Sequence, residues 1–350
     1  MNLKYALENL KTIDVLEMGK AEKHWLSIVK PLFSLGRLET AITKMAGING
    51  KADFSIKNKT LVIMCADNGV VEEGVAQCGQ SVTATVAKSF MEGKSSVCIM
   101  AERTGVDILP VDAGMATDIG GMESIKNAYG TENISKGPAM SRNQCIEIME
   151  KSIDLAGKLA DSDCNIILTG EMGIGNTTTA AAVTAALLDK SASEVTGRGA
   201  GLSSGGLEKK IETVKKALEV NIPNKTDPID IISKVGGFDI AAMTGLFIGG
   251  AVHGVPVVID GLISSVAALA AVRINENIRD FILPSHLSSE PAGSMLLTEL
   301  GLEPYITCGM FLGEGSGAVA VMPLFDMAMD IYKSLGTFDN WEHEAYKVLE

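Results

Sequence analysis

The segment GEMGIGNTTT (residues 170–179) combines glycines, a carboxylate and hydroxyls between an apolar run and an alanine-rich helical pattern. Glycine lets backbone N–H groups approach a ligand closely, and the N-terminus of the following helix favours an anion. The segment lacks a Walker A lysine and the G-x-G-x-x-G spacing, so it predicts neither a nucleoside triphosphate site nor a dinucleotide site. A phosphate or sugar site and a tight turn needed only for packing both remain open.

A second glycine cluster, GRGAGL (residues 197–202), is followed by two lysines, Lys209 and Lys210. A lysine could neutralise a phosphate as a point charge. A pair of lysines in a helical pattern is more often a solvated helix face, with the stems lying on the surface. The residues alone therefore favour the solvated face.

The segment LGEGSGA (residues 312–318) places Glu314 among glycines just before a helical pattern. A carboxylate in this position could act as a general base, and burial would raise its pKa toward the working pH. Alternatively, it could complement the positive end of the helix dipole, which would hold its pKa low. Both interpretations remain open.

Three aspartates, Asp67, Asp112 and Asp260, each follow or end an apolar run. They could converge on a metal ion, but such residues more often accept hydrogen bonds from nearby backbone N–H groups, and we expect that role here. His286, in PSHLSSEPAG, could be a second acid or base, although a lone histidine is more often structural. Ser288 and Ser289 beside it could donate to a phosphate.

The elements that would position these residues alternate between strands and helices. Apolar runs at residues 60–65, 106–111, 165–169 and 256–259 each lead into Asp- or Gly-containing turns, and helical patterns such as 211–220 and 264–272 separate them. We therefore predict an α/β fold with a mainly parallel, Rossmann-like sheet flanked by helices, and a site where the carboxyl ends of the strands open into loops. Residues 1–50 predict helix, loop, helix.

Two further positions could be boundaries. Residues 221–227 (NIPNKTD) are either a short linker or a turn between helices, and Pro323 either kinks a helix or lies in its first turn. The polar segment from Thr337 onward is expected to be peripheral.

Composition excludes several classes of protein. The chain has 350 residues, 46% of them hydrophobic, which excludes a disordered chain, and its net charge of −13 argues against a nucleic-acid partner. Six scattered cysteines and four histidines show no zinc or disulfide spacing. The most apolar region, residues 241–272, is interrupted by polar residues and proline, and the first residues carry charges, so neither a membrane span nor a leader is indicated. We expect a reduced, cytoplasmic, soluble protein.

Taken together, these segments resemble the nicotinate mononucleotide:5,6-dimethylbenzimidazole phosphoribosyltransferase family, which activates the lower-ligand base of cobamides. The resemblance covers nearly the whole chain, in order, through KPLFSLGRLE, CADNGVVEEGV, PAMSR, GEMGIGNTT, KVGGFD, DGLISS, PSHLSSE, GLEPY and LGEGSGA. It implies a large α/β catalytic domain (residues 51–324), a small helical domain from both chain ends (residues 1–50 and 325–350), and a dimer with the active site near the interface.

The resemblance also implies roles for individual residues. Glu314 would be the catalytic base and Glu171 would contact the ribose. The nicotinate nucleotide would be lined by Gly173, Gly199, Lys210, Gly261 and Ser288, with Leu312 and Gly313 beside the base, which reverses the interpretation of Lys210 as solvated. The reaction would be one displacement at the anomeric carbon with inversion, and it requires no metal or cofactor.

Departures from the family pattern gather where the acceptor would bind. Asn68 stands where the family commonly has histidine, Cys78 and Val82 lie in an altered Ser-Pro-Lys-Glu-Val-Thr stretch, Val86 replaces a polar glutamine, and Phe33 replaces a glycine. Phe33, Cys78, Val82 and Val86 therefore predict a more apolar acceptor pocket. Because some relatives transfer phosphoribose to phenol or p-cresol through paired paralogous subunits, the acceptor could be dimethylbenzimidazole or a phenol, and the dimer could be a homodimer or a heterodimer. The alternative is a catalytically silent paralogous subunit.

Overall fold

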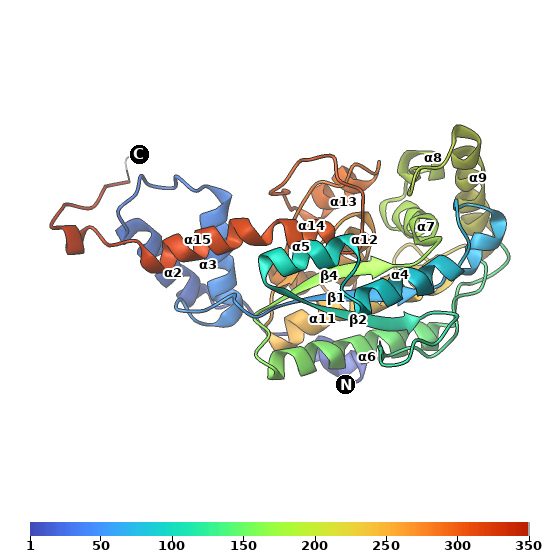
Figure 1. The fold of residues 1–350 in the computed structure, drawn as a ribbon, viewed down its shortest axis with the longest axis horizontal. Coiled ribbons are helices and arrows are strands. Elements are labelled where there is room, and N and C mark those ends of the chain that lie inside the picture. The colour runs from blue at the N-terminus through green and yellow to red at the C-terminus, as the bar shows by residue number, and fades with distance from the viewer. Residues whose placement is uncertain (349–350) are drawn as a thin grey trace.

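A six-stranded sheet in which every neighbouring pair is parallel forms the centre of the computed structural model, which describes residues 1–348 (Figure 1). Its strand order is β3-β2-β1-β4-β5-β6, as in doubly wound sheets. The strands are β1 Lys59–Ala66, β2 Val106–Gly114, β3 Glu123–Ser124, β4 Ile166–Met172, β5 Val257–Val258 and β6 Ile282–Leu283. The predicted α/β class with a mainly parallel sheet is confirmed, and the strand order reverses between β1 and β4, where ligands bind in such folds.

Strand β1 shows why the apolar runs lack alternation. Val62 and Met64 belong to the hydrophobic cluster on one face of the sheet, whereas Leu61 and Ile63 belong to the cluster on the other. All four side chains are fully buried. A strand covered on both faces needs apolar residues at every position, which produces a continuous run.

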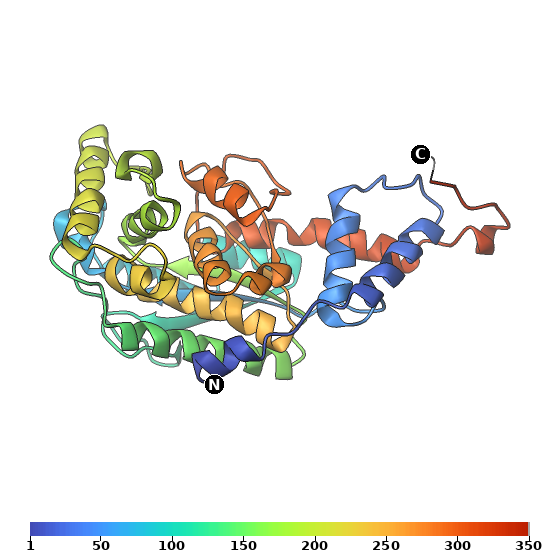
Figure 2. The same cartoon turned by 180° about the vertical axis from the view of Figure 1, so that it is seen from behind.

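One face of the sheet is covered by helices α6 (Arg142–Asp161) and α11 (Phe238–His253), with α1 (Leu3–Glu8) packed against both (Figure 2). A Cβ at Gly249 would lie 3.1 Å from the Cα of Ile153 and would overlap Ala156, so the two helices approach closely only because glycine stands there. Helices α7 (Asn176–Leu188), α10 (Pro228–Val235) and α12 (Leu262–Ile274) contribute to the same core.

The other face is covered by α4 (Ser81–Met91), α5 (Ser96–Thr104) and α14 (Ser316–Ala320). After α14 the chain continues into α15 (Met322–Ser334), with Pro323 in the first turn, so the first-turn interpretation of Pro323 is correct. The remaining helices are α8 (Ala192–Val195), α9 (Ser204–Asn221), α13 (Gly293–Leu300) and the 3₁₀ turns Gly69–Glu73, Glu276–Phe281 and Asp339–Trp341. Residues 222–227 join α9 to α10 and are a turn between helices.

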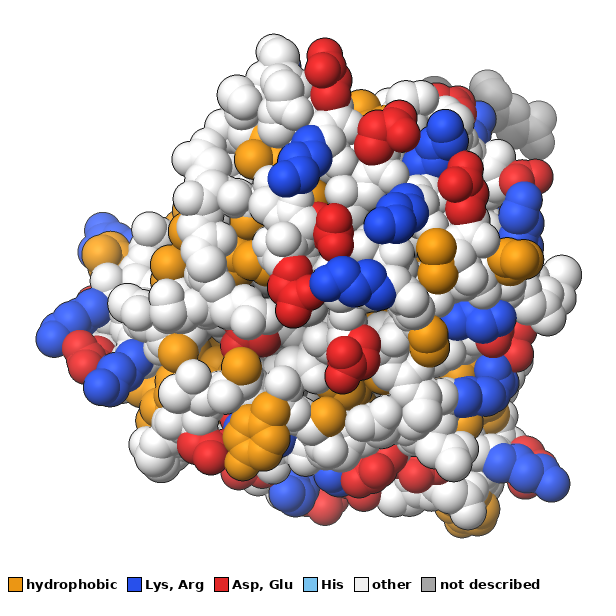
Figure 3. Space-filling model, turned by 90° about the vertical axis from the view of Figure 1, so that its right-hand side faces the viewer, with side chains coloured by type: hydrophobic (Ala, Val, Ile, Leu, Met, Phe, Trp, Pro, Cys, Tyr) orange, Lys and Arg blue, Asp and Glu red, His pale blue; other side chains and the backbone are white. Residues whose placement is uncertain are grey.

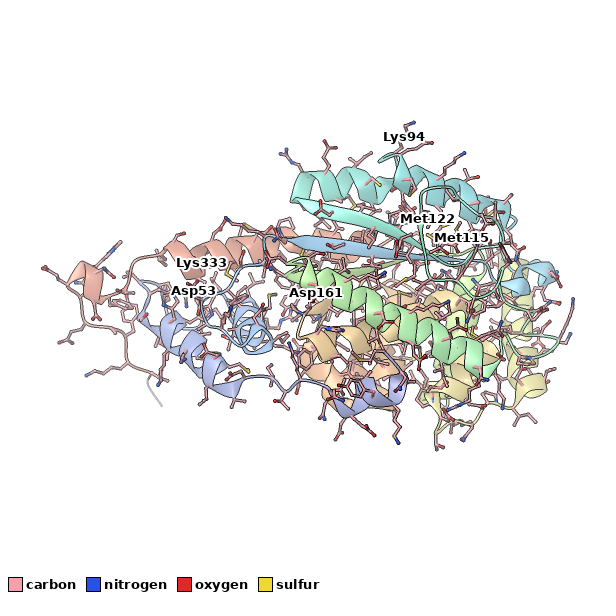
Figure 4. All side chains as sticks on the ribbon, turned by 90° about the horizontal axis from the view of Figure 1, so that it is seen from below. Asp53, Lys94, Met115, Met122, Asp161 and Lys333 are labelled. Atoms are coloured by element: carbon pink, nitrogen blue, oxygen red, sulfur yellow. The ribbon has the colours of Figure 1, made fainter. Side chains whose placement is uncertain are left out.

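Helices α2 (Val15–Ser27) and α3 (Arg37–Asn49) pack with α15 at one end of the molecule, whereas the N-terminus lies beside α6 (Figure 1). The Tyr332 ring of α15 stacks edge-on against Trp25 of α2, and Lys333 lies 3.4 Å from the Asp53 carboxylate, next to it in Figure 4. In contrast to α2 and α3, α1 packs on α6 and α11. The division at residues 50 and 325 stays a prediction, and residues 349–350 of its second segment lie outside the described chain.

The surface carries mixed charge. On the face drawn in Figure 3, acidic and basic side chains are interspersed, without a continuous basic patch. Among residues 1–348, no helix combines the length and the apolar character needed to cross a bilayer.

Candidate active site

A cavity of about 210 Å³ opens at the carboxyl ends of β4, β5 and β6. It brings together residues that lie up to 143 positions apart in the chain, from Glu171 to Glu314. Eight of the residues predicted for the nucleotide and the base line it: Glu171, Gly173, Gly199, Gly261, Ser288, Leu312, Gly313 and Glu314. Parallel strand ends and the loops after them are therefore the scaffold of the site.

Glu314 lies in a strained loop. Gly313, Glu314 and Gly315 have φ angles of 79°, 61° and 91°, so three consecutive residues adopt the left-handed region. This conformation is costly for glutamate, and such strain occurs mainly at functional sites. A Cβ at Gly170 of β4 would lie 2.7 Å from the Glu314 carbonyl oxygen, so the loop rests directly on the strand because residue 170 is glycine.

The Glu314 carboxylate is only partly satisfied. Its Oε2 is buried without a hydrogen-bond partner, although the side chain lines the cavity. Burial, and then the negative charge of Asp260, raise its pKa above the usual glutamate value, against an opposing backbone interaction with Val97. A raised pKa contradicts the alternative in which the helix dipole holds the pKa of this carboxylate low.

Glu171 is the residue before the last one of β4 and also lines the cavity. Its carboxylate accepts a hydrogen bond from Asn176 and lies so close to Gly313 that a Cβ there would be 2.6 Å from Oε1. Burial, followed by the charge of Asp239, raises the pKa of Glu171 to about 8. Burial also raises the pKa of Asp239 to about 6. Near neutral pH, these pKa values leave Glu171 mostly protonated and Asp239 mostly ionised.

We expect Glu171→Gln to raise thermal stability selectively at alkaline pH. The folded chain keeps this carboxyl protonated up to about pH 8, whereas the unfolded chain releases the proton near the usual glutamate value of 4.5, so wild-type stability falls as pH rises between these values. Glutamine cannot ionise and escapes that loss. Its melting temperature should exceed the wild-type value at about pH 9 by roughly 2–4 °C per kcal/mol recovered, with little difference at about pH 5. Thermal melts of Glu102→Gln, an exposed residue of α5, provide the control; equal effects of both variants would contradict the assignment.

Lys210 is fully buried behind the cavity wall, so the solvated-face interpretation is wrong. Its Nζ donates to Thr177 Oγ1 at 2.7 Å, and a Cβ at Gly199 would lie 3.3 Å from Nζ. Burial lowers the pKa of Lys210 to about 8, while the charge of Glu290 opposes the shift. Glu290 Oε1 also accepts the Gly199 N–H at 3.0 Å, so the lysine lies beside the glycine loop that lines the cavity.

The residues predicted for the acceptor pocket do not line this cavity. Phe33 is 60% exposed in the loop between α2 and α3, and Cys78 is exposed before α4. Val82 and Val86 lie on α4, whose Thr83 hydroxyl accepts the N–H of the cavity residue Ile174 at 3.2 Å. Val82 and Val86 therefore lie on a helix that contacts the cavity wall through Thr83.

The three strand-end aspartates bond backbone N–H groups. Asp112 Oδ1 accepts from Gly114 and Met115, and Asp67 Oδ2 accepts from Ala116. Asp260 accepts from Gly315, just before α14, and from Gly317 and Ala318 in the first turn of that helix. Within residues 1–348, no group of three or more His, Cys, Asp or Glu side chains has the geometry to hold a metal ion.

The sequence interpretation missed several residues of the site. Asp239, Asn176, Thr177 and Glu290 were not singled out, although they surround Glu171 and Lys210. Asp239 ends the motif KVGGFD and Glu290 ends PSHLSSE, so a signal was present in the motifs. The pKa of Asp239 depends on its burial, and this burial arises only when α11 and the segment after β6 pack against β4. The sequence alone therefore does not reveal it.

Comparison with known proteins identifies the family. A family model described as phosphoribosyltransferase matches residues 10–342. The chain belongs to this phosphoribosyltransferase family. The nicotinate-nucleotide–dimethylbenzimidazole phosphoribosyltransferases of Ruminiclostridium cellulolyticum and Clostridium acetobutylicum are 46% and 44% identical to it, each over 352 residues and the full length of both chains.

Solved structures agree with this assignment. The crystal structure of CobT from Thermus thermophilus superposes with a TM-score of 0.89 at 31% identity, covering 94% of this chain and 99% of the other. A nicotinate-nucleotide–dimethylbenzimidazole phosphoribosyltransferase structure from the same organism gives 0.88 at 30% identity and covers 95% and 100%. The chain is thus a phosphoribosyltransferase with the fold of its relatives throughout.

Proposed function

We propose that this phosphoribosyltransferase moves the 5-phosphoribosyl group of nicotinate mononucleotide to a cobamide lower-ligand base, either 5,6-dimethylbenzimidazole or a phenol such as p-cresol. Nicotinate is released and an α-riboside phosphate is formed with inversion. The observation that carries the proposal is the unpaired, buried carboxylate oxygen of Glu314 in a cavity that also holds Glu171 and the glycine loops. The full-length similarity to relatives that carry this name supports it.

In the proposed reaction, Glu314 accepts the proton of the azole N–H or phenol O–H. The freed electron pair attacks the anomeric carbon from the face opposite nicotinate. The bond between that carbon and the pyridinium nitrogen breaks, its electrons stay on nitrogen, and neutral-ring nicotinate leaves. A positioned base of this kind typically contributes about 10²–10⁴-fold, and a raised pKa makes it a stronger base.

The remaining residues would position the nucleotide. Lys210, Ser288 and the Gly199 loop are proposed to hold the phosphate, with Glu171 at the ribose. The backbones of Gly173, Gly261 and Gly313 would allow close approach, and Leu312, 52% exposed at the mouth, would form an apolar wall. Positioning of this kind can supply several kcal/mol of the barrier.

The acceptor is proposed to bind between the cavity and α4. There Cys78 and Val86 replace more polar residues of the family pattern, and Val82 lies between them in the sequence. A contribution from Phe33 would come from a second chain, which is consistent with a dimer, either of identical chains or with a paralogue. Incubation of the chain with nicotinate mononucleotide and, separately, dimethylbenzimidazole, adenine, phenol or p-cresol, followed by mass spectrometry, identifies the acceptor class. Phenolic ribosides would support the acceptor switch, and azole products alone would contradict it.

We expect Val86→Gln to shift acceptor preference toward azoles. A glutamine amide can hydrogen-bond an azole nitrogen, and one such bond is typically worth about 1 kcal/mol, or roughly fivefold. The ratio of kcat/KM for dimethylbenzimidazole over p-cresol should rise by about this factor. Ile99→Gln on the exposed face of α5 serves as the control. An unchanged ratio would show that Val86 does not contact the acceptor.

A further inference from the structure

We infer that Asp260 is a positioning residue that holds the loop of Glu314 in its strained conformation. The inference rests on the proposed role of Glu314 as the base. Asp260 is 2% exposed and faces the start of α14. It lies two residues after the end of β5. Nothing in its position at a strand end requires a carboxylate, because many such ends carry neutral residues.

The contacts of Asp260 are concentrated on the residues just after Glu314. Oδ2 accepts the N–H of Gly315 at 3.1 Å, and Oδ1 accepts the N–H groups of Gly317 at 2.7 Å and Ala318 at 3.3 Å. Gly315 is the N-cap residue of α14, and Gly317 and Ala318 lie in its first turn, where N–H groups have no partner within the helix. A charged acceptor makes stronger hydrogen bonds than a neutral one, so the carboxylate fixes this end of the loop.

Asp260 is itself anchored to the sheet. Its N–H lies 3.3 Å from Thr169 Oγ1 and 3.2 Å from Ser264 Oγ, and its carbonyl oxygen accepts from Ser285 Oγ at 3.0 Å. Thr169 also donates to the carbonyl oxygen of Val258. The carboxylate therefore connects the base loop to β4, β5 and the segment after β6, the three elements that carry the rest of the site.

Glu314 depends on such an anchor because the backbone interaction with Val97 is the single contact described for its carboxyl group. Its Oε2 has no hydrogen-bond partner, and its backbone and both neighbours have positive φ angles. A loop of this kind would relax toward commoner conformations unless outside contacts hold it. Displacing a catalytic group by about 1 Å can cost about 10²-fold in rate.

The chain offers a control in Asp112, whose replacement additionally removes an ion pair with Lys126 at 2.8 Å. This aspartate is also buried at a strand end and accepts backbone N–H groups, from Gly114 at 3.1 Å and Met115 at 2.8 Å, but it does not line the cavity. Both aspartates can be replaced by asparagine, which keeps the shape and one acceptor oxygen. General effects of losing a buried carboxylate therefore appear in both variants, and effects on the base loop appear only in Asp260→Asn.

The test combines kinetics with amide hydrogen exchange on the full chain. We expect Asp260→Asn to lower kcat about 10–100-fold with KM for nicotinate mononucleotide changed less than about threefold, and Asp260→Ala to lower kcat further. Exchange of a peptide spanning residues 311–321 should accelerate in both variants. Asp112→Asn should change neither quantity. Ser285→Ala removes the hydrogen bond to the Asp260 carbonyl oxygen and should change kcat and exchange in the same direction by a smaller amount. This variant provides the test if an Asp260 variant does not fold.

Unchanged exchange at residues 311–321 in the Asp260 variants would overturn the inference. So would faster exchange with an unaltered kcat, because the loop would then not need the anchor. If the wild-type chain transfers no phosphoribose, the proposed function fails, whereas the exchange measurement still decides whether Asp260 holds the loop.

Discussion

Glu314→Gln is expected to lower kcat by about 10²–10⁴-fold while leaving KM for nicotinate mononucleotide nearly unchanged. Glutamine retains the shape of the side chain and can occupy the same strained loop, but it cannot accept the proton of the acceptor. Because the nucleotide would be held by the glycine loops and Lys210, its binding should persist. Steady-state assays of nicotinate release measure both constants.

The pH profile gives this prediction a second readout. Since burial raises the pKa of Glu314 above the usual glutamate value of 4.5, the wild-type rate should fall as the pH drops, along a limb centred above that value. The residual rate of Glu314→Gln should lack that limb. Glu102→Gln, on the exposed face of α5, is the control and should behave as wild type. A Glu314→Gln variant that retains at least half the wild-type kcat would exclude Glu314 as the base.

Lys210→Met is expected to raise KM for nicotinate mononucleotide by about 10–100-fold. A hydrogen bond to a charged group is worth about 1.5–3 kcal/mol, and methionine keeps the length of the stem without the charge. Because burial lowers the pKa of Lys210 to about 8, the wild-type KM should also rise as the pH increases through that value, when the lysine loses its proton. Lys210→Met should lose this alkaline dependence.

The adjacent Lys209 is the matched control. It is exposed on the same helix, α9, so Lys209→Met removes the same charge from the chain without touching the cavity wall. Isothermal titration with nicotinate mononucleotide should give wild-type affinity for Lys209→Met and weak binding for Lys210→Met. Equal affinities for the two variants would show that Lys210 is only a buried structural residue.

The elements with long apolar runs are those that the sequence predicts well. Strands β1, β2 and β4 contain the predicted runs because both faces of each central strand are buried. Strands β3 and β6 are only two residues long and have no periodicity to detect, so they were missed. Some helix boundaries also differ from the expected ones. Helix α9 begins at Ser204, seven residues before the expected pattern, because its first turn is rich in glycine and lacks the apolar periodicity of a helix.

The sequence predicts which residues form the site better than it predicts how deeply each of them is buried. Glycine-rich segments mark Glu314 and Glu171, because close backbone approach leaves a trace in the residue types. Burial leaves no such trace in a lysine, which explains why Lys210 resembled a surface residue until the fold placed it against Thr177. Phe33 shows the converse limit: its substitution is visible in the sequence, but the structure places its side chain at an exposed position outside the cavity.

The measurement that tests the central claim most directly is product analysis of the purified chain with nicotinate mononucleotide and 5,6-dimethylbenzimidazole or p-cresol. We predict release of one nicotinate per riboside phosphate formed, with the product in the α configuration by NMR, and loss of both products in Glu314→Gln. A β-configured product, or transfer that survives in Glu314→Gln at the wild-type rate, would contradict a single inverting displacement assisted by this base.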